Sequence, residues 1–164
     1  MQTAITRTEL GLYQAQRPVT RDEIIGFAHG LIAESFIRKA SLSDPAAAKD
    51  FLVLELGREE REVFAVVFLD RQNRVIAFER LFEGTIDHAT IHAREVVKRC
   101  LVHNAAAVVL THNHPSGVPE PSASDKQLTK DLIDALLLID VTVLDHIIVG
   151  GAETVSLAER GGIG

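Results

Sequence analysis

Cysteine and large aromatic residues are scarce in this sequence, which has one cysteine, one tyrosine and no tryptophan among 164 residues. A single cysteine cannot form an internal disulfide, and it cannot supply the several thiolates of a structural zinc cluster. It also excludes a zinc nucleoside deaminase, because those enzymes need a Pro-Cys-x-x-Cys motif after His-x-Glu. We therefore expect Cys100 to be a buried structural thiol.

Long apolar runs are also missing. Apolar runs such as Ala105–Leu110 and Ala135–Ile139 are short, whereas a membrane-spanning helix needs roughly 20 apolar residues. The segment Met1–Leu12 lacks the basic-then-apolar order of a signal peptide. We therefore expect no membrane association and a cytoplasmic protein.

The sequence has no basic stripe. Its formal net charge is −6 and its isoelectric point is about 5.6, and basic clusters such as Arg71/Arg74 and Lys98/Arg99 have acidic neighbours. Proteins that bind the nucleic-acid backbone by charge usually carry clustered lysine and arginine. Direct nucleic-acid binding is therefore disfavoured.

The apolar pattern predicts a mixed α/β (α+β) fold, with a mixed, mostly antiparallel sheet flanked by helices. The apolar fraction of 46% and the charged fraction of 24% are typical of a globular domain. Helices are expected over 21–40, 44–57, 90–103 and 123–139, and strands over 62–69, 74–82, 105–111, 141–149 and 154–157.

We expect two parts along the chain. Residues 1–43 form an N-terminal helical extension, and residues 44–164 form the single α/β domain. The second part opens with Asp44-Pro45, an N-cap residue followed by proline at the first helical position. The helix over 21–40 is expected to pack on the domain or to join two copies in a homodimer.

The string from His112 to Asp125 carries the most chemistry. His112 and His114 are two residues apart, so in an extended chain their side chains project to the same side, with alpha carbons roughly 6.6 Å apart. Asp125 falls in the first turn of the next predicted helix. Two imidazoles and a carboxylate suit zinc and leave a fourth position for water, as in catalytic zinc sites.

A second interpretation of the same string is structural. Ser122 and Asp125 also form a capping box at a helix start, and His-x-His pairs are common on solvated turns. The pair and the box are joined by a loop with three prolines and one glycine. Such a loop is stiff, as a preorganised site requires, and this favours the metal site.

The spacing His-x-His, seven residues, Ser-x-x-Asp resembles the JAMM motif of the MPN (JAB) metalloproteases. Further segments resemble the RadC branch of that superfamily, and the resemblance extends from about Asp44 to the C-terminus. These segments are His112–Gly117, Pro121-Ser122, Gly84-Thr85, Arg94-Glu95, Asn104–Ala106 and Asp145-His146.

This resemblance implies a zinc-dependent hydrolase with one zinc ion per chain. His112, His114 and Asp125 would bind the metal, and the Ser122 hydroxyl would stabilise the oxyanion. The scissile bond in the superfamily is a peptide or isopeptide bond, so a protein or peptide substrate is expected. The resemblance does not supply the substrate itself.

The family also needs an upstream glutamate as general base, and we predict Glu79 in this role. Strand alternation places Glu79 between Ala77 and Leu81, where partial burial would raise its pKa. Glu83, at the end of the same strand, is expected to be more solvated and is the alternative. The RadC-like pattern also favours Glu79.

His146 lies within an apolar strand, and we interpret it as a structural histidine. The alternative is that it donates a hydrogen bond to a ligand carboxylate from behind the site.

Other functions fit the sequence less well. The letters His-Asn-His also occur in HNH nucleases, but three letters in an acidic chain are weak support. The main alternative is a noncatalytic or accessory RadC-like factor in DNA repair or recombination. Longer RadC-like proteins carry a helix-hairpin-helix region, and we find no such signature before residue 44. We therefore expect a short, stand-alone version.

Overall fold

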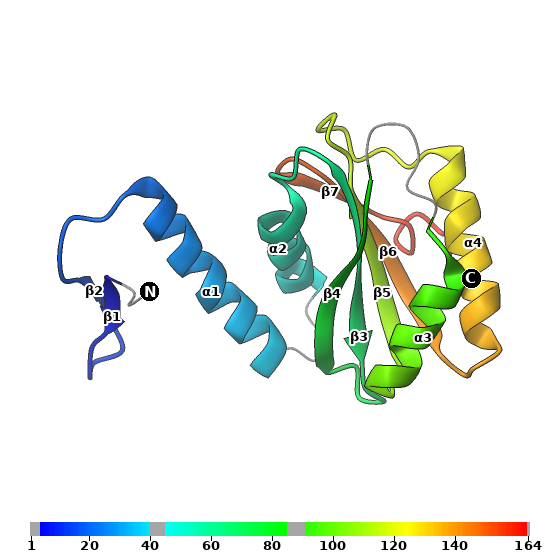
Figure 1. Cartoon of the computed structure of the whole chain (residues 1–164), viewed down its shortest axis with the longest axis horizontal. Helices are drawn as coiled ribbons and strands as arrows, with labels where there is room; N and C mark the ends of the chain where they lie inside the picture. The colour runs from blue at the N-terminus through cyan, green and yellow to red at the C-terminus, as the bar shows by residue number, and fades with distance from the viewer. Residues whose placement is uncertain (1–3, 40–44, 85–90, 164) are drawn as a thin grey trace.

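The computed structural model describes residues 4–39, 45–84 and 91–163, with side-chain detail outside 33–39 and residue 45. Within these ranges, a five-stranded sheet is flanked by helices, and a short hairpin precedes the first helix (Figure 1). The helices are α1 (Arg21–Lys39), α2 (Pro45–Leu56), α3 (Ala93–His103) and α4 (Ala123–Leu137). The strands are β1 (Ile5–Arg7), β2 (Tyr13–Ala15), β3 (Glu62–Leu69), β4 (Val75–Gly84), β5 (Ala107–Asn113), β6 (Thr142–Gly150) and β7 (Glu153–Ser156).

The large sheet has the strand order β4-β3-β5-β6-β7. The pairs β4-β3, β3-β5 and β6-β7 are antiparallel, and β5-β6 is parallel. A parallel pair needs a crossover connection, and α4 supplies it. The sheet is therefore mixed and mostly antiparallel, which confirms the predicted α/β fold.

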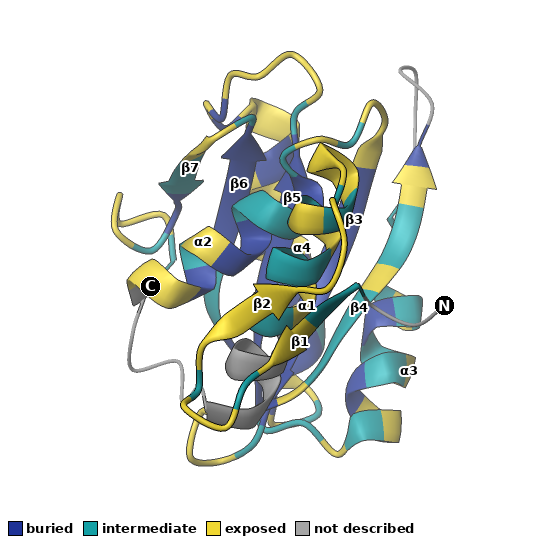
Figure 2. Ribbon diagram, turned by 90° about the vertical axis from the view of Figure 1, so that its left-hand side faces the viewer, coloured by how far each residue is buried: buried dark blue, intermediate teal, exposed yellow. Residues whose placement is uncertain are grey.

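Helices cover both faces of the sheet. In Figure 1, α2 lies on one side, and α3 and α4 lie on the other. Alternate residues of the central strands project from opposite faces of the sheet. Val67 and Val109 pack in the cluster that includes α2, and Val66 and Leu110 pack in the cluster that includes α3 and α4. Buried residues therefore fill the middle of the domain (Figure 2), and β3 and β5 appear in sequence as continuous apolar runs.

One strand lies two residues later in the sequence than we predicted, and this shift affects the site. We predicted a strand over 105–111, but β5 runs from Ala107 to Asn113. Asn104 ends α3 in the left-handed conformation, with φ of 50°, and the Ala105 amide still bonds back to the Cys100 carbonyl. The chain therefore turns before it enters the sheet, and His112 belongs to the strand rather than to the following loop.

The first part of the chain differs partly from the prediction. Helix α1 is present, and His29 Nε2 lies 2.5 Å from Glu55 Oε1 of α2. The hairpin β1-β2 was not predicted, because its two short strands are largely exposed and lack apolar alternation. The predicted boundary at 43/44, including the Asp44 cap, lies outside the described residues and stays a prediction.

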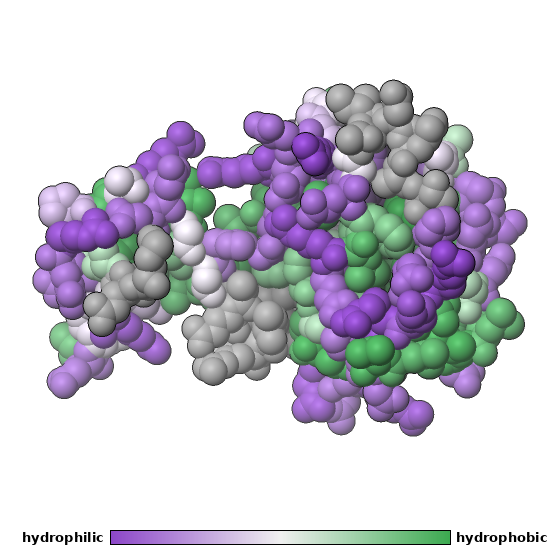
Figure 3. All heavy atoms as spheres, viewed as in Figure 1, coloured by the Kyte–Doolittle hydropathy of each residue, from purple (hydrophilic) through white to green (hydrophobic). Residues whose placement is uncertain are grey.

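Figure 3 shows mainly hydrophilic side chains over the hairpin and α1, and an apolar area near the ends of α3 and α4. Exposed apolar residues in those ends are Leu101, Val102, Leu137 and Leu138. The expectation of a homodimer stays a prediction. No helix in the described ranges combines the length and the apolar character that a bilayer crossing demands.

Candidate metal centre

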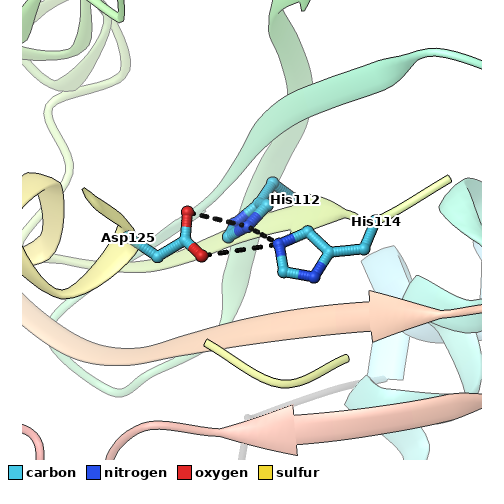
Figure 4. Close-up of side chains that lie close together, drawn as sticks. All are labelled: His112, His114 and Asp125. Atoms are coloured by element: carbon cyan, nitrogen blue, oxygen red, sulfur yellow. Dashed lines mark hydrogen bonds and ion pairs between the residues drawn. The ribbon is translucent and has the colours of Figure 1, made fainter. Parts of the chain in front are cut away.

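The three predicted ligands meet where β5 ends and α4 begins (Figure 4). His112 lies within β5, His114 follows the strand directly, and Asp125 lies in the first turn of α4. The His114 amide donates to the Val149 carbonyl of β6, at 2.8 Å. This bond holds His114 against the sheet after β5 has ended, so both imidazoles face the start of α4.

The side chains approach one another closely. His112 Nε2 and His114 Nε2 are 3.0 Å apart. His112 Nε2 is 3.3 Å from Asp125 Oδ1, and His114 Nε2 is 3.4 Å from Asp125 Oδ2. One ligand atom from each residue therefore lies within 4.8 Å of the others. The three residues can hold one metal ion.

Hydrogen-bond directions around His114 agree with a metal ligand. His114 Nδ1 lies 2.8 Å from the Val118 carbonyl oxygen. A carbonyl oxygen only accepts, so Nδ1 carries the proton, and in the neutral ring Nε2 carries a lone pair. This lone pair and the Asp125 carboxylate converge on one point, as the ligands of a cation do. The donor set therefore fits a metal ion.

Asp125 stays ionised at this point. Burial by itself raises the pKa of its carboxyl group, but the adjacent His112 and Ser122 side chains lower it by more, and the net pKa is well below the usual range. An ionised carboxylate is the form that binds a metal.

The capping box and the candidate metal site coexist. The Ser122 amide donates to Asp125 Oδ2 at 2.8 Å, and the Asp125 amide donates to Ser122 Oγ at 3.1 Å. Neither bond uses Asp125 Oδ1, which faces His112. The two interpretations of the string therefore describe the same residues, with Oδ2 used mainly by the helix cap.

Ser122 is exposed at the N-terminus of α4, and its hydroxyl donates to Asp125 Oδ2 at 2.6 Å. It also lies 2.8 Å from the Ser124 hydroxyl. The hydroxyl is thus beside the candidate ligands and open to solvent. Its role toward a substrate stays a prediction.

Glu79 does not have the environment that we predicted. Arg99 Nε donates to Glu79 Oε2 at 2.6 Å, Arg99 Nη2 donates to Oε1, and His103 Nε2 lies 2.8 Å from Oε1. The Arg99 hydrogen bond, followed by that of His103, lowers the pKa of Glu79 despite its partial burial. The expected rise in pKa is wrong, because two residues one turn apart on α3 face this strand. Glu79 as the general base stays a prediction with less support.

The alternative, Glu83, faces away from the ligands. Its partner across the sheet is Val63, which packs in the cluster on the α2 side. His112 is the partner of Phe64, which packs on the α3 and α4 side. Glu83 therefore projects from the other face of the sheet.

A third glutamate, Glu62, was missed from the sequence. It begins β3 and lies two residues before Phe64, so alternation places it on the same face as His112. If the β3-β5 register is continued by two residues beyond the pair Phe64 and His112, Glu62 lies at the level of His114. Asn113 holds these strand ends together, because its Oδ1 accepts from the Val63 amide at 2.8 Å. The alternation of β3 was visible in sequence, but the register with β5 was not.

His146 contacts a candidate ligand from behind. Its Nε2 lies 2.8 Å from His112 Nδ1, and its Nδ1 lies 2.6 Å from Thr129 Oγ1. Burial, followed by the nearby His112, lowers the pKa of His146 to about 3, so the ring is neutral. The burial of His146 agrees with its interpretation as a structural histidine. The alternative, a contact with a ligand from behind the site, is met as well, but the partner is the His112 imidazole and not a carboxylate.

Comparison with known proteins agrees with the motif. Residues 42–162 match the family described as the RadC-like JAB domain. A UPF0758 protein of Stutzerimonas stutzeri (strain A1501) is 57% identical over 130 residues, which cover 79% of this chain and 58% of that protein. A UPF0758 protein of Vibrio parahaemolyticus is 49% identical over 153 residues, which cover 93% of this chain and 68% of that protein. The matches therefore span little more than half of the first relative and about two thirds of the second.

Proposed function

Since the chain belongs to the RadC-like JAB domain family, we propose that it is a zinc-dependent hydrolase of the JAMM type. It cleaves a peptide or isopeptide bond, with water as the nucleophile. The observation that carries the proposal is the convergence of His112, His114 and Asp125 on one point. The substrate is accordingly a protein or peptide.

The ligand set supports zinc as the metal. Two imidazole nitrogens and one carboxylate oxygen are the ligands of many catalytic zinc sites, which leave a fourth position open. His114 is only partly buried, so solvent and substrate can reach that side. A bound zinc ion would supply Lewis acidity and lower the pKa of a coordinated water molecule.

Ser122 provides a donor for the oxyanion. Its hydroxyl is exposed and adjoins Asp125 at the N-terminus of α4. Rotation of the hydroxyl away from Asp125 Oδ2 turns its proton toward the site. The positive end of the α4 dipole favours negative charge at the same place. The Asp125 amide keeps its bond to Ser122 Oγ, because that bond uses an oxygen lone pair.

Glu62 is the best-placed general base among the three glutamates. It starts β3 on the face that carries His112, and it is exposed. Glu79 is held by Arg99 and His103, and Glu83 projects from the opposite face. In the proposed reaction, Glu62 takes a proton from the attacking water and passes it to the leaving amine.

The first test is metal analysis of the purified chain combined with cleavage of peptide and isopeptide libraries. We expect close to one equivalent of zinc, its loss in His114→Ala and Asp125→Ala, and cleavage by the parent alone. A stably folded, metal-free parent that His114→Ala leaves unchanged would refute the metal site. Zinc binding without cleavage of any library member would instead favour a noncatalytic or accessory RadC-like role.

A further inference from the structure

Behind the metal site runs a buried chain of hydrogen bonds through three elements. It joins His112 of β5, His146 of β6 and Thr129 of α4, which are 1%, 0% and 2% exposed. His112 Nδ1 and His146 Nε2 are 2.8 Å apart, and His146 Nδ1 and Thr129 Oγ1 are 2.6 Å apart. Thr129 Oγ1 in turn lies 2.6 Å from the main-chain oxygen of Asp125. This series of hydrogen bonds therefore begins at one candidate ligand, His112, and ends at the backbone of another, Asp125.

The donor and the acceptor of each hydrogen bond follow from the Asp125 carbonyl, at the far end of this series. The Asp125 carbonyl can only accept, so the single hydroxyl proton of Thr129 points to it. The Thr129 oxygen must then accept from His146, and His146 Nδ1 carries a proton. A neutral imidazole has one donor and one acceptor, so His146 Nε2 accepts and His112 Nδ1 donates to it.

This direction decides which nitrogen of His112 is free. With the proton on Nδ1, the lone pair of His112 is on Nε2, the atom that faces His114 and Asp125. The opposite tautomer would place a proton on Nε2, where it would prevent metal coordination. Complete burial keeps His146 neutral, since a charged ring would be costly to desolvate.

The sheet is shaped to bring His146 into this position. The parallel pairing of β5 and β6 shifts register after Val108, so that Leu110 lies beside His146. Val143 packs on the α4 side and Leu144 on the α2 side, yet His146 contacts Thr129 of α4. Without the irregularity, simple alternation would turn Asp145, rather than His146, toward α4. Such irregularities commonly re-aim a side chain.

We propose that Thr129 and His146 are positioning residues that fix His112 as the Nδ1-protonated tautomer and so present its Nε2 to the metal. The inference rests on the proposed function for its biological purpose. The tautomer itself is a property of the metal-free chain. It can therefore be tested whether or not the chain hydrolyses any bond.

The chain offers matched variants for the test. Thr129→Val removes the hydroxyl at nearly constant volume, and Thr129→Ser restores it. Thr111→Val is the control: Thr111 is also fully buried, and its hydroxyl has no hydrogen-bond partner among the described residues. Without the Thr129 hydroxyl, His146 is free to place its proton on Nε2, and His112 must then protonate its own Nε2.

The experiment uses the full chain, labelled with ¹⁵N, with two readouts. Two-bond ¹H–¹⁵N spectra of the metal-free protein report the tautomer of each histidine ring, and competition with a chromophoric chelator gives the zinc dissociation constant. In the parent, Thr111→Val and Thr129→Ser, we expect His112 protonated on Nδ1. In Thr129→Val, we expect a changed tautomer population and zinc affinity lower by about tenfold or more, as for other residues that orient metal ligands.

The outcomes separate the two proposals. A parent whose His112 is protonated on Nε2, or a Thr129→Val chain with parental tautomer and parental zinc affinity, would overturn the positioning role. A parent with the expected tautomer, changed only by Thr129→Val, supports the hydrogen-bond chain even if no peptide is cleaved. In that case only the hydrolase proposal fails.

Discussion

The Nε2 atoms of His112 and His114 lie 3.0 Å apart, with the Asp125 carboxylate 3.3 and 3.4 Å away from them. The Val118 carbonyl oxygen accepts a hydrogen bond from His114 Nδ1, and His146 Nε2 accepts one from His112 Nδ1. Both Nε2 lone pairs therefore face a carboxylate with no proton between them. Such a cluster of acceptors is unfavourable unless a cation joins it.

Metal removal should therefore destabilise the folded chain. At a free zinc concentration of one hundred times the dissociation constant, binding stabilises the native state by about 2.7 kcal/mol. For a domain of this size this corresponds to a rise in Tm of roughly 5–10 °C. Thermal denaturation with zinc and with a chelator measures the difference. Asp125→Ala should show almost no zinc-dependent rise, and Thr111→Val should respond as the parent does; an equal rise in Asp125→Ala would contradict the ligand assignment.

Glu62→Gln should abolish cleavage while zinc stays bound. The amide keeps the size of the side chain but cannot accept the proton from water, and loss of a general base typically lowers the rate 100- to 10,000-fold. Glu62 begins β3 on the face of His112, so the fold should not change. Rates and zinc content are measured together. Glu79→Gln and Glu83→Gln are the controls, and a chain inactivated by Glu79→Gln but not by Glu62→Gln would restore our prediction from the sequence.

The difference between these glutamates explains which part of the site the sequence could predict. His112, His114, Ser122 and Asp125 lie in one short string, and the capping box fixes where α4 begins. Local rules were therefore enough to bring the ligands together. The position of the proposed general base, Glu62, depends on how β3 aligns with β5, which is set by packing between segments far apart in the chain.

The same limit explains the error about Glu79. Alternation along β4 correctly suggested that this residue is partly buried, but it did not reveal Arg99 and His103 on α3. The overall fold was easier to predict, because α4 and the buried strands have strong apolar patterns. The hairpin β1-β2 has no such pattern, and it was missed.

Ser122→Ala should lower both stability and activity. Loss of an N-cap side chain costs about 0.5–2 kcal/mol, and the Asp125 amide loses its partner. Loss of an oxyanion donor should reduce kcat by roughly 100- to 1,000-fold. Ser124→Ala, in the same turn, is the control, since Ser124 is not the helix cap. Denaturant titration and steady-state rates would separate the effects; parental kcat in Ser122→Ala would limit the residue to its capping role.

The Glu79 ion pair predicts a specific pH dependence of stability. Arg99, followed by His103, lowers the pKa of Glu79 in the folded state. Its contribution is therefore fully present above the unfolded pKa of about 4.3 and is lost as the pH falls through the lower folded value. Glu79→Gln should cost roughly 1 kcal/mol or less near pH 7, since the pair is partly solvated.

This cost should shrink at pH values below 4. Urea titrations of the parent and Glu79→Gln over that range measure it. Glu83→Gln, on the same strand but outside this ion pair, controls for the loss of a carboxyl group from β4. A difference between parent and Glu79→Gln that grows as the pH falls would show that the pair does not stabilise the folded chain.

Gly150→Ala should damage the metal site by moving the loop that carries the partner of His114. A Cβ at this position would lie 2.6 Å from Pro119 Cδ and 2.7 Å from the Gly117 carbonyl oxygen. Both atoms belong to the stiff loop that presents the Val118 carbonyl to His114 Nδ1. The loop must shift, the orientation of His114 is lost, and zinc affinity should fall about tenfold or more.

Gly57→Ala is the matched control for this substitution. A Cβ there would also collide with backbone, first with the Gly151 carbonyl oxygen and then with the Val53 carbonyl oxygen at 2.6 Å. These clashes fall on the turn between β6 and β7 and on the end of α2, not on residues 117–119 of the loop. Both variants should be destabilised by strain of similar origin. Only Gly150→Ala should lose zinc affinity beyond what its loss of stability explains, as measured by chelator competition below the Tm of both variants. Equal zinc affinity in the two would mean that the loop does not orient His114.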